Sequence, residues 1–117
     1  LNNLIAIVDY NKIQSLDSVE NTLNLEPFKD KWTSFGWNVL EVDGHEINSI
    51  IFAYKEALKS IKKPTCIIAH TIKGKGVSFF ENSVLWHYRS AKDDEYIRAK
   101  NELKNIKKLK DLEQMMR

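Results

Sequence analysis

Asp9, Tyr10 and Asn11 follow directly after a short apolar run, and the side-chain oxygens of Asp9 and Asn11 could act as metal ligands. Carboxylate and amide oxygens are hard donors that suit magnesium or calcium. One Asn side chain with a neighbouring backbone carbonyl would fill two corners of a magnesium octahedron, so a carboxylate, a phosphate or water must supply the rest. The same residues also fit a simple turn after a strand, because Asn and Asp favour turns.

A glycine-rich basic segment, Lys73-Gly74-Lys75-Gly76, is the second candidate site. Glycine lets backbone N–H groups approach an anion closely, and lysine adds positive charge. The spacing matches neither the Walker A sequence nor the Gly-x-Gly-x-x-Gly fingerprint. The segment therefore fits a phosphate site and a flexible basic turn about equally well.

His87 stands between two large aromatic residues, Trp86 and Tyr88, and Arg89 follows. An imidazole can donate a hydrogen bond to phosphate or transfer a proton near neutral pH. A guanidinium can pair with phosphate through two N–H groups. The alternative is a loop that the two aromatic rings pin in place, with the imidazole merely packed between them. Both interpretations stay open at this point.

Composition excludes several classes of protein. The 117 residues are 43% hydrophobic and 29% charged, as in ordinary soluble domains. A formal net charge of +2 is too small to indicate nucleic acid or a membrane surface as partner, and the longest apolar runs are too short to span a bilayer. The single cysteine, Cys66, excludes an intrachain disulfide and predicts a buried structural thiol in a reducing, cytoplasmic compartment. The sequence opens at Leu1 without a methionine, and we expect a truncation point there.

The elements that must position these candidates alternate between strand and helix. Apolar runs at residues 4–8 and 65–70 predict strands buried on both faces, and residues 37–42 alternate enough to form another. Strand, helix, strand, helix, strand predicts an α/β fold with a parallel sheet. Ligands in such folds bind at the carboxyl ends of the strands, where the Asp-Tyr-Asn segment and the glycine loop begin.

Three helices complete the pattern. Pro27 favours a helix start, and Gly36 ends the run, so we expect the intervening aromatic residues in the core. A last helical segment begins near Asp93. The apolar positions of the middle helix fall on one face, which we expect to be buried: Ile47, Ile50, Ile51, Tyr54 and Leu58. The apolar positions of the first helix, which follows Pro27, are Phe28, Trp32 and Phe35.

In their order along the chain, these motifs resemble the thiamine-diphosphate-binding domain of transketolases. Residues 5–14 resemble the end of the family's cofactor motif, and residues 24–37 resemble the segment that follows it. Residues 41–45 match the next strand end, residues 69–78 the family's glycine loop, and residues 86–87 its late histidine motif. Each motif is short, but the ordered set is specific, and it most resembles the N-terminal subunit of split, two-chain transketolases.

The resemblance implies that residues 1–103 are the C-terminal part of the thiamine-diphosphate-binding domain, without its N-terminal part, and that residues 104–117 form a basic C-terminal helix or tail. Enzymes of this family move a two-carbon ketol unit between sugar phosphates with thiamine diphosphate and magnesium. The resemblance also implies a homo- or hetero-oligomer with a partner subunit or domain that carries the pyrimidine-binding half, and no nucleic-acid or membrane partner.

The resemblance assigns roles to five residues. Asn11 matches the family's Asn ligand of magnesium, and Ile13 matches the residue whose backbone carbonyl also binds the ion. Lys73 and Gly74 match positions that lie against the cofactor. His87 matches a histidine near the diphosphate and the reacting carbon, where it assists proton transfer.

This sequence departs from the family's pattern in two respects. The Gly-Asp-Gly that opens the cofactor motif is absent, so half of the metal site is not in this sequence. Tyr88 stands where many members have glycine, which leaves the substrate open. The glutamate that activates the cofactor's aminopyrimidine ring lies on the pyrimidine-binding half in this family. We therefore expect that the chain alone is not a complete catalyst.

Three alternatives stay open on the sequence. A deoxyxylulose-phosphate synthase or a dehydrogenase E1 component could share the glycine loop, although the Asn-Leu-Glu-Pro and Trp-His segments favour a transketolase. A non-catalytic module for a phosphorylated ligand would need a closed core, whereas three strands leave sheet edges exposed. A helix over residues 103–116, with an apolar stripe that includes Leu109, Leu112 and Met116, could instead dock a partner.

Overall fold

The computed structural model describes residues 1–115, apart from the side chains of residues 108–113 and 115. The chain divides into two compact units, Leu1–Thr71 and Ile72–Arg117. The apolar stripe predicted for the C-terminal helix includes Leu109, Leu112 and Met116, which lie outside the described side chains. Within the described residues, no helix has the length and apolar character that a membrane span requires.

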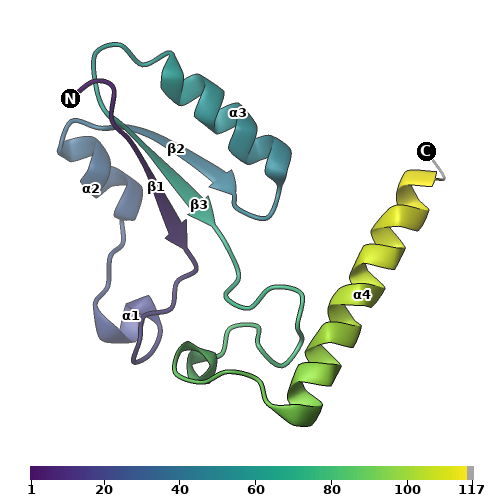
Figure 1. Ribbon diagram of the computed structural model, residues 1–117. Coiled ribbons are helices and arrows are strands. Elements are labelled where there is room, and N and C mark those ends of the chain that lie inside the picture. Colours follow the sequence, from purple (N-terminus) through teal and green to yellow (C-terminus); the bar gives the residue numbers. More distant parts are fainter. Residues whose placement is uncertain (116–117) are drawn as a thin grey trace. The chain divides into compact units, whose positions relative to one another are not determined.

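The first unit contains a parallel sheet of three strands (Figure 1). They are β1 (Ile5–Tyr10), β2 (Asn38–Asp43) and β3 (Thr65–His70), in the order β1-β3-β2. Both pairings are parallel, and helical crossovers join β1 to β2 and β2 to β3. This confirms the predicted α/β class with flanking helices.

The strands end at the same level, which gathers their last residues along one edge of the sheet. Tyr10 of β1 and Asp43 of β2 are both in register with His70 of β3. The carboxyl edge is where ligands bind in parallel sheets, so the register brings the ends of all three strands to that edge.

The central strand and the outer strand differ in burial. β3 is buried along residues 65–69, as its continuous apolar run predicted. β1 lies at the sheet edge, and Ile7 is 56% exposed. The prediction that residues 4–8 are buried on both faces is therefore wrong within this chain, because helix α2 packs against only one face of this strand.

Helix α2 (Phe28–Ser34) packs against one face of the sheet. The helix starts after Pro27, as predicted, and the rings of Phe28 and Trp32 contact the core of that face. Phe35 is 84% exposed, contrary to the prediction that it belongs to the core. The helix ends at Ser34, so Phe35 sits in the C-terminal turn rather than on the inner face. The core of this face consists of Tyr10, Val19, Cys66 and Ile68.

Helix α3 (Ile47–Leu58) covers the opposite face, because Ile67 contacts it whereas Cys66 and Ile68 point to α2. Its bounds agree with the prediction, but its buried face does not. Ala53 and Ala57 are buried against the sheet, where small side chains allow a close approach. The predicted apolar face is largely exposed, with Ile47 72%, Ile51 46%, Tyr54 47% and Leu58 61% accessible.

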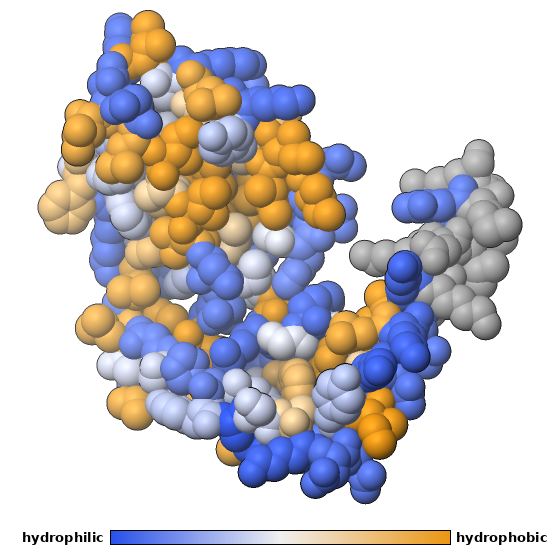
Figure 2. All heavy atoms as spheres, viewed as in Figure 1, coloured by the Kyte–Doolittle hydropathy of each residue, from blue (hydrophilic) through white to orange (hydrophobic). Residues whose placement is uncertain are grey.

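Large apolar side chains therefore remain on the surface of the first unit. Figure 2 shows them gathered over this unit in the view of Figure 1. Soluble monomers rarely expose this much contiguous apolar surface, so the unit does not have the closed exterior of a self-sufficient module.

The second unit consists of a loop, a short 3₁₀ helix η1 (Val84–His87) and the long helix α4 (Asp93–Met115). The start of α4 agrees with the prediction, whereas η1 was not predicted. The domain boundary predicted between residues 103 and 104 falls within α4 and stays a prediction. A further short helix, α1 (Val19–Thr22), lies in the first unit. Ser18 caps its N-terminus, because its side chain accepts a hydrogen bond from the N–H of Asn21.

Candidate functional site

The segment after β1 is a tight turn that contains both residues predicted to bind magnesium, Asn11 and Ile13. The side-chain oxygen of Asn11 accepts a hydrogen bond from the N–H of Ile13 at 3.0 Å. Lys12 between them adopts a left-handed backbone with φ of 61°. The Asn11 amide is therefore folded back over the backbone of Ile13, whose carbonyl is the second predicted donor.

This donor set suits magnesium but fills only part of a coordination shell. Amide and carbonyl oxygens are hard ligands, and magnesium usually adds a carboxylate, phosphate oxygens and water. Among the described residues, no group of three or more His, Cys, Asp and Glu side chains could hold a metal. Asp9, a candidate on sequence grounds, accepts a hydrogen bond from the hydroxyl of Thr71 instead. Asn11 and Ile13 therefore remain as a fitting half of a magnesium site.

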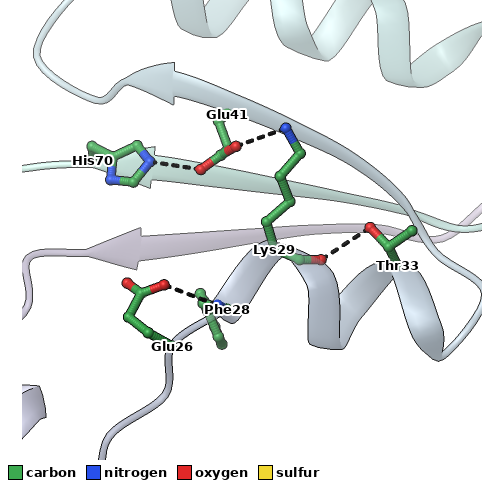
Figure 3. Close-up of polar contacts among 6 residues, drawn as sticks. All are labelled: Glu26, Phe28, Lys29, Thr33, Glu41 and His70. Carbon is green, nitrogen blue, oxygen red and sulfur yellow. Dashed lines mark hydrogen bonds and ion pairs between the residues drawn. The ribbon is translucent and has the colours of Figure 1, made fainter.

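A polar network that sequence reasoning missed lies beside this turn. The Glu41 carboxylate of β2 bridges two cationic or titratable side chains (Figure 3): Lys29 Nζ lies 2.9 Å from Oε2, and His70 Nε2 lies 3.1 Å from Oε1. The hydrogen bond from Lys29, followed by that from His70, lowers the pKa of Glu41. The same bond to Glu41 raises the pKa of Lys29.

Tyr10 forms the second half of that network. Its hydroxyl donates to the Glu26 carboxylate at 2.6 Å. This carboxylate also accepts from the N–H of Phe28 at 3.0 Å, the bond drawn in Figure 3. Burial, with the bond to Glu26, raises the pKa of Tyr10 to about 12. The bond from Tyr10 in turn lowers the pKa of Glu26. The ring of Tyr10 packs against those of Phe28 and His70, with centroids 4.9 and 5.7 Å apart.

One sequence signal could have found the network. Val39 packs on the face that α2 covers, and Glu41 two residues later must lie on the same face because side chains alternate along a strand. A carboxylate on a covered face needs a partner, since burying an unpaired charge is costly. Which residue is the partner depends on the strand order, which the sequence pattern does not contain.

In the second unit, the glycine loop is an ordered turn. The N–H of Gly76 donates to the Glu81 carboxylate at 3.0 Å, and that of Ser78 donates to the Glu102 carboxylate at 2.6 Å. Two more N–H groups donate to carbonyl oxygens of the loop. The four engaged N–H groups are those of Lys75, Gly76, Val77 and Ser78. These four N–H groups are therefore engaged by groups of this chain. Lys73 and Gly74 are the loop positions that the resemblance assigns to the cofactor.

Gly74 is required by close packing as well as by its backbone. Its φ is +75°, a conformation that residues with a side chain rarely adopt. A Cβ atom at this position would lie 2.7 Å from the backbone of Phe80. The loop therefore approaches residue 80 more closely than any larger residue allows.

The loop before α4 is pinned by Trp86. Its indole N–H donates to the carbonyl of Phe79 at 2.8 Å, and its ring packs against those of Phe79 and Phe80. The guanidinium of Arg89 lies 4.5 Å from the centre of the Trp86 ring and pairs with Glu95. Arg89, a candidate phosphate ligand on sequence grounds, thus has a carboxylate partner within its own unit.

His87 ends the 3₁₀ helix, and its ring meets that of Tyr88 edge-on, with centroids 5.0 Å apart. Tyr88 has φ of −108°, so the backbone at this position does not require glycine. The Tyr88 side chain is 64% exposed. The structure thus brings Asn11 and Ile13 together in the first unit, whereas Lys73, Gly74 and His87 belong to the second.

Cys66 is the second residue of β3 and is fully buried, which confirms the prediction of a buried thiol. Burial raises the pKa of its thiol to about 11, which disfavours the thiolate near neutral pH.

Comparisons with known proteins agree on one family. The family model described as "Transketolase, thiamine diphosphate binding domain" matches residues 1–109. A subunit of the apulose-4-phosphate transketolase of Phocaeicola vulgatus is 41% identical over 110 residues, which cover 93% of this chain and 39% of that protein. The 6-deoxy-6-sulfo-D-fructose transketolase subunit SqwG of Clostridium sp. (strain MSTE9) is 46% identical over 88 residues, 74% of this chain and 32% of that protein.

Solved structures give the same result. Transketolase of Pichia stipitis in complex with sedoheptulose-7-phosphate has a TM-score of 0.78 and 31% identity, and the match covers 87% of this chain and 15% of that one. Transketolase of Campylobacter jejuni has a TM-score of 0.67 and 36% identity, covering 72% of this chain and 13% of that one. The chain thus spans about two fifths, or less, of the length of the curated relatives it matches.

Proposed function

The chain belongs to the transketolase family, in its thiamine-diphosphate-binding domain, and from this premise we propose that it is part of an enzyme that moves a two-carbon ketol unit between sugar phosphates. The observation that carries the proposal is the match of 41% identity over 93% of the chain to a transketolase subunit. The α/β fold, with its strand ends gathered at one edge, agrees with it.

The cofactors in this proposal are thiamine diphosphate and magnesium. When bound, thiamine diphosphate supplies the chemistry that stabilises the carbanion left when a carbon–carbon bond breaks. The side-chain oxygen of Asn11 and the carbonyl oxygen of Ile13 would be the two magnesium ligands from this chain, which their hard-donor chemistry and their place in one tight turn support.

Residues of the second unit serve the cofactor and the substrate. Lys73 and Gly74 would contact the cofactor, where the lysine charge would favour its diphosphate. His87 would donate to the diphosphate and carry a proton, which an imidazole can do near neutral pH. Tyr88 next to it presents an exposed ring, so the substrate is bounded there by an aromatic side chain rather than by glycine.

A partner subunit or domain completes the enzyme. Two relatives are named as subunits, which supports a partner chain that carries the pyrimidine-binding half and an oligomeric enzyme. The apolar surface left on the first unit gives such an assembly area to bury. Sugar phosphates are the substrates in this proposal, and the cytoplasm is the compartment, in line with the unpaired buried Cys66.

The relatives found favour a transketolase over deoxyxylulose-phosphate synthase and over dehydrogenase E1 components. The exposed apolar side chains and the open edge of β1 argue against a self-sufficient binding module.

The test uses the full-length protein with its partner subunit. Titration calorimetry with thiamine diphosphate, with and without magnesium, should show binding that requires the ion. Asn11→Ala should weaken the affinities for magnesium and cofactor together, because one coordination shell holds both. His87→Ala should lower kcat more than cofactor affinity.

Asn101→Ala, at an exposed position of α4, is the matched control and should change neither affinity. Binding of the cofactor that is indifferent to magnesium in the wild type would contradict the proposed site. An unchanged magnesium requirement in Asn11→Ala would remove Asn11 from it.

A further inference from the structure

The two residues that precede Asn11 are both held by the end of β3. Asp9 accepts a hydrogen bond from the hydroxyl of Thr71, and the carbonyl of Tyr10 accepts one from the N–H of Thr71 at 3.3 Å. The ring of His70 lies against the ring of Tyr10, with centroids 5.7 Å apart and planes at 60°. Contacts with the neighbouring strand β3 and with Thr71 after it therefore hold the last residues of β1 in place.

Tyr10 is held on its other sides as well. Its hydroxyl donates to Glu26 at 2.6 Å, its ring packs on Phe28 at 4.9 Å, and only 5% of the residue is exposed. A side chain with contacts on its tip and on both flanks cannot turn without breaking several of them. The position of its backbone, from which Asn11 continues, is fixed with it.

His70 is itself held by a contact with Glu41 of the other neighbouring strand, β2. Its Nε2 atom lies 3.1 Å from Glu41, which also pairs with Lys29 at 2.9 Å (Figure 3). A continuous set of contacts thus runs from α2 through β2 and β3 to the end of β1. His70 is the member of this set that contacts both Glu41 and Tyr10.

The turn that follows needs such support. Lys12 adopts a left-handed backbone, which is unfavourable for a residue with a side chain, and it persists only where the neighbouring structure holds it. The Asn11 side chain is oriented by its bond to the N–H of Ile13 on the far side of that residue. Loss of the anchor at Tyr10 would let this turn relax and move the Asn11 oxygen.

We propose that His70 is a positioning residue of the cofactor site: its ring, packed against Tyr10, fixes the end of β1 and thereby the oxygen donors of Asn11 and Ile13. This inference rests on the proposed function, because it concerns the same magnesium site. His70 touches neither ion nor substrate in it, and acts only through Tyr10.

The experiment compares variants of the full-length protein, assembled with its partner subunit. His70→Ala removes the ring and the bond to Glu41, whereas His70→Phe keeps a ring against Tyr10 and removes only the bond. Glu41→Gln is the matched control, since it removes the negative charge from the network and leaves the His70–Tyr10 contact in place. For each variant, calorimetry gives the magnesium concentration for half-maximal binding of thiamine diphosphate, and kinetics give kcat at saturation.

We expect His70→Ala to raise that magnesium concentration about tenfold, as is typical when the support of a metal ligand is lost. kcat at saturating magnesium and cofactor should stay nearly unchanged, because no group that touches the reacting atoms is removed. His70→Phe should stay close to the wild type, and so should Glu41→Gln.

Two results would overturn the proposal. Unchanged magnesium dependence in His70→Ala would show that the ring does not position the ligands. An equal rise of the half-maximal magnesium concentration in Glu41→Gln would show a general loss of stability rather than a loss of positioning by the His70 ring. Thermal unfolding of every variant accompanies the titrations. If His70→Ala does not fold, His70→Gln against His70→Phe replaces it, and Gln should show the larger rise because it lacks the ring.

The same titrations separate this inference from the function it rests on. Wild-type protein that binds the cofactor only with magnesium supports the proposed function whatever the His70 variants do. Wild-type protein that binds no thiamine diphosphate would overturn the proposed function itself.

Discussion

The strand ends of the first unit and the glycine loop of the second unit are held by different kinds of contact. At the strand ends, side chains on neighbouring strands contact one another, as His70 does with Glu41 and Tyr10. In the glycine loop, backbone N–H groups donate to carboxylates, as those of Gly76 and Ser78 do to Glu81 and Glu102.

The difference follows from what each region has to hold. Parallel strands already fix the backbone through their ladder, so side chains only need to orient what emerges from the ends. The loop has no ladder, and its glycines have no side chains with which to make contacts. Its backbone must therefore be held directly, by carboxylates or by close packing.

The sharpest test of this comparison uses two glycines with similar backbone angles. Gly74 of the loop has φ of +75° and would place a Cβ 2.7 Å from the backbone of Phe80, whereas Gly36 has φ of +85° and open space around it. Gly74→Ala should lower the free energy of unfolding by about 2–5 kcal/mol, from backbone strain together with the steric clash. Urea unfolding of the full-length protein measures the loss.

Gly36→Ala is the matched control, because it has the strain without the clash. It should cost about 1–2 kcal/mol. Equal losses in the two variants would mean that close packing does not hold the loop, and that backbone angle alone explains both glycines.

A second test removes a carboxylate from the loop. Glu102 accepts from both the N–H and the hydroxyl of Ser78, at 2.6 and 3.0 Å. Glu102→Ala should cost about 1–2 kcal/mol, because a charged acceptor is lost and the partly exposed donors regain water. Hydrogen exchange of the Ser78 amide, measured by NMR, should become about tenfold faster.

The Gly76 amide serves as an internal control in the same sample, since it donates to Glu81 instead. Its exchange should stay unchanged. Faster exchange at both amides would show that Glu102 stabilises the whole unit rather than the loop segment at Ser78.

The sequence predicted where some elements begin and end, but not which of their faces are buried. The bounds of α3 and β3 followed from local patterns, since apolar spacing and a continuous β-branched run depend only on neighbouring residues. The buried face of α3 did not. Apolar spacing shows which residues could be covered, whereas Ala53 and Ala57 lie against the sheet because small side chains permit the closest approach.

The long-range contacts could not be predicted in either region. Glu41 and His70 are 29 residues apart, and they meet because β3 is the central strand, beside β2. Ser78 and Glu102 are 24 residues apart and meet through the fold of the second unit. The candidate ligands Asn11 and Ile13 were assigned by resemblance. Their local turn, with its hydrogen bond and its left-handed residue, did not by itself identify them as ligands.

The smallest expected effect tests whether charge contributes at the strand ends. Lys29 and His70 lower the pKa of Glu41 below its ordinary value of 4.5, so the folded protein favours the ionised form. The stabilisation is therefore fully present above about pH 5 and is lost as the pH falls through the lowered pKa. Glu41→Gln should cost about 0.2–1 kcal/mol near pH 6, because the pair is partly exposed, and the cost should vanish once the pH falls well below the lowered pKa of Glu41.

A double-mutant cycle with Lys29→Met separates the pair from the rest of the network. The coupling energy between Lys29 and Glu41, from urea unfolding of the four proteins, should follow the same pH dependence as the single variant. A coupling that persists after Glu41 has been protonated would mean that the contact is not an ion pair. If the cost of Glu41→Gln does not change with pH, shape and hydrogen bonding rather than charge hold the strand ends together. The contrast with the loop, whose backbone is bound by carboxylates, would then rest on geometry alone.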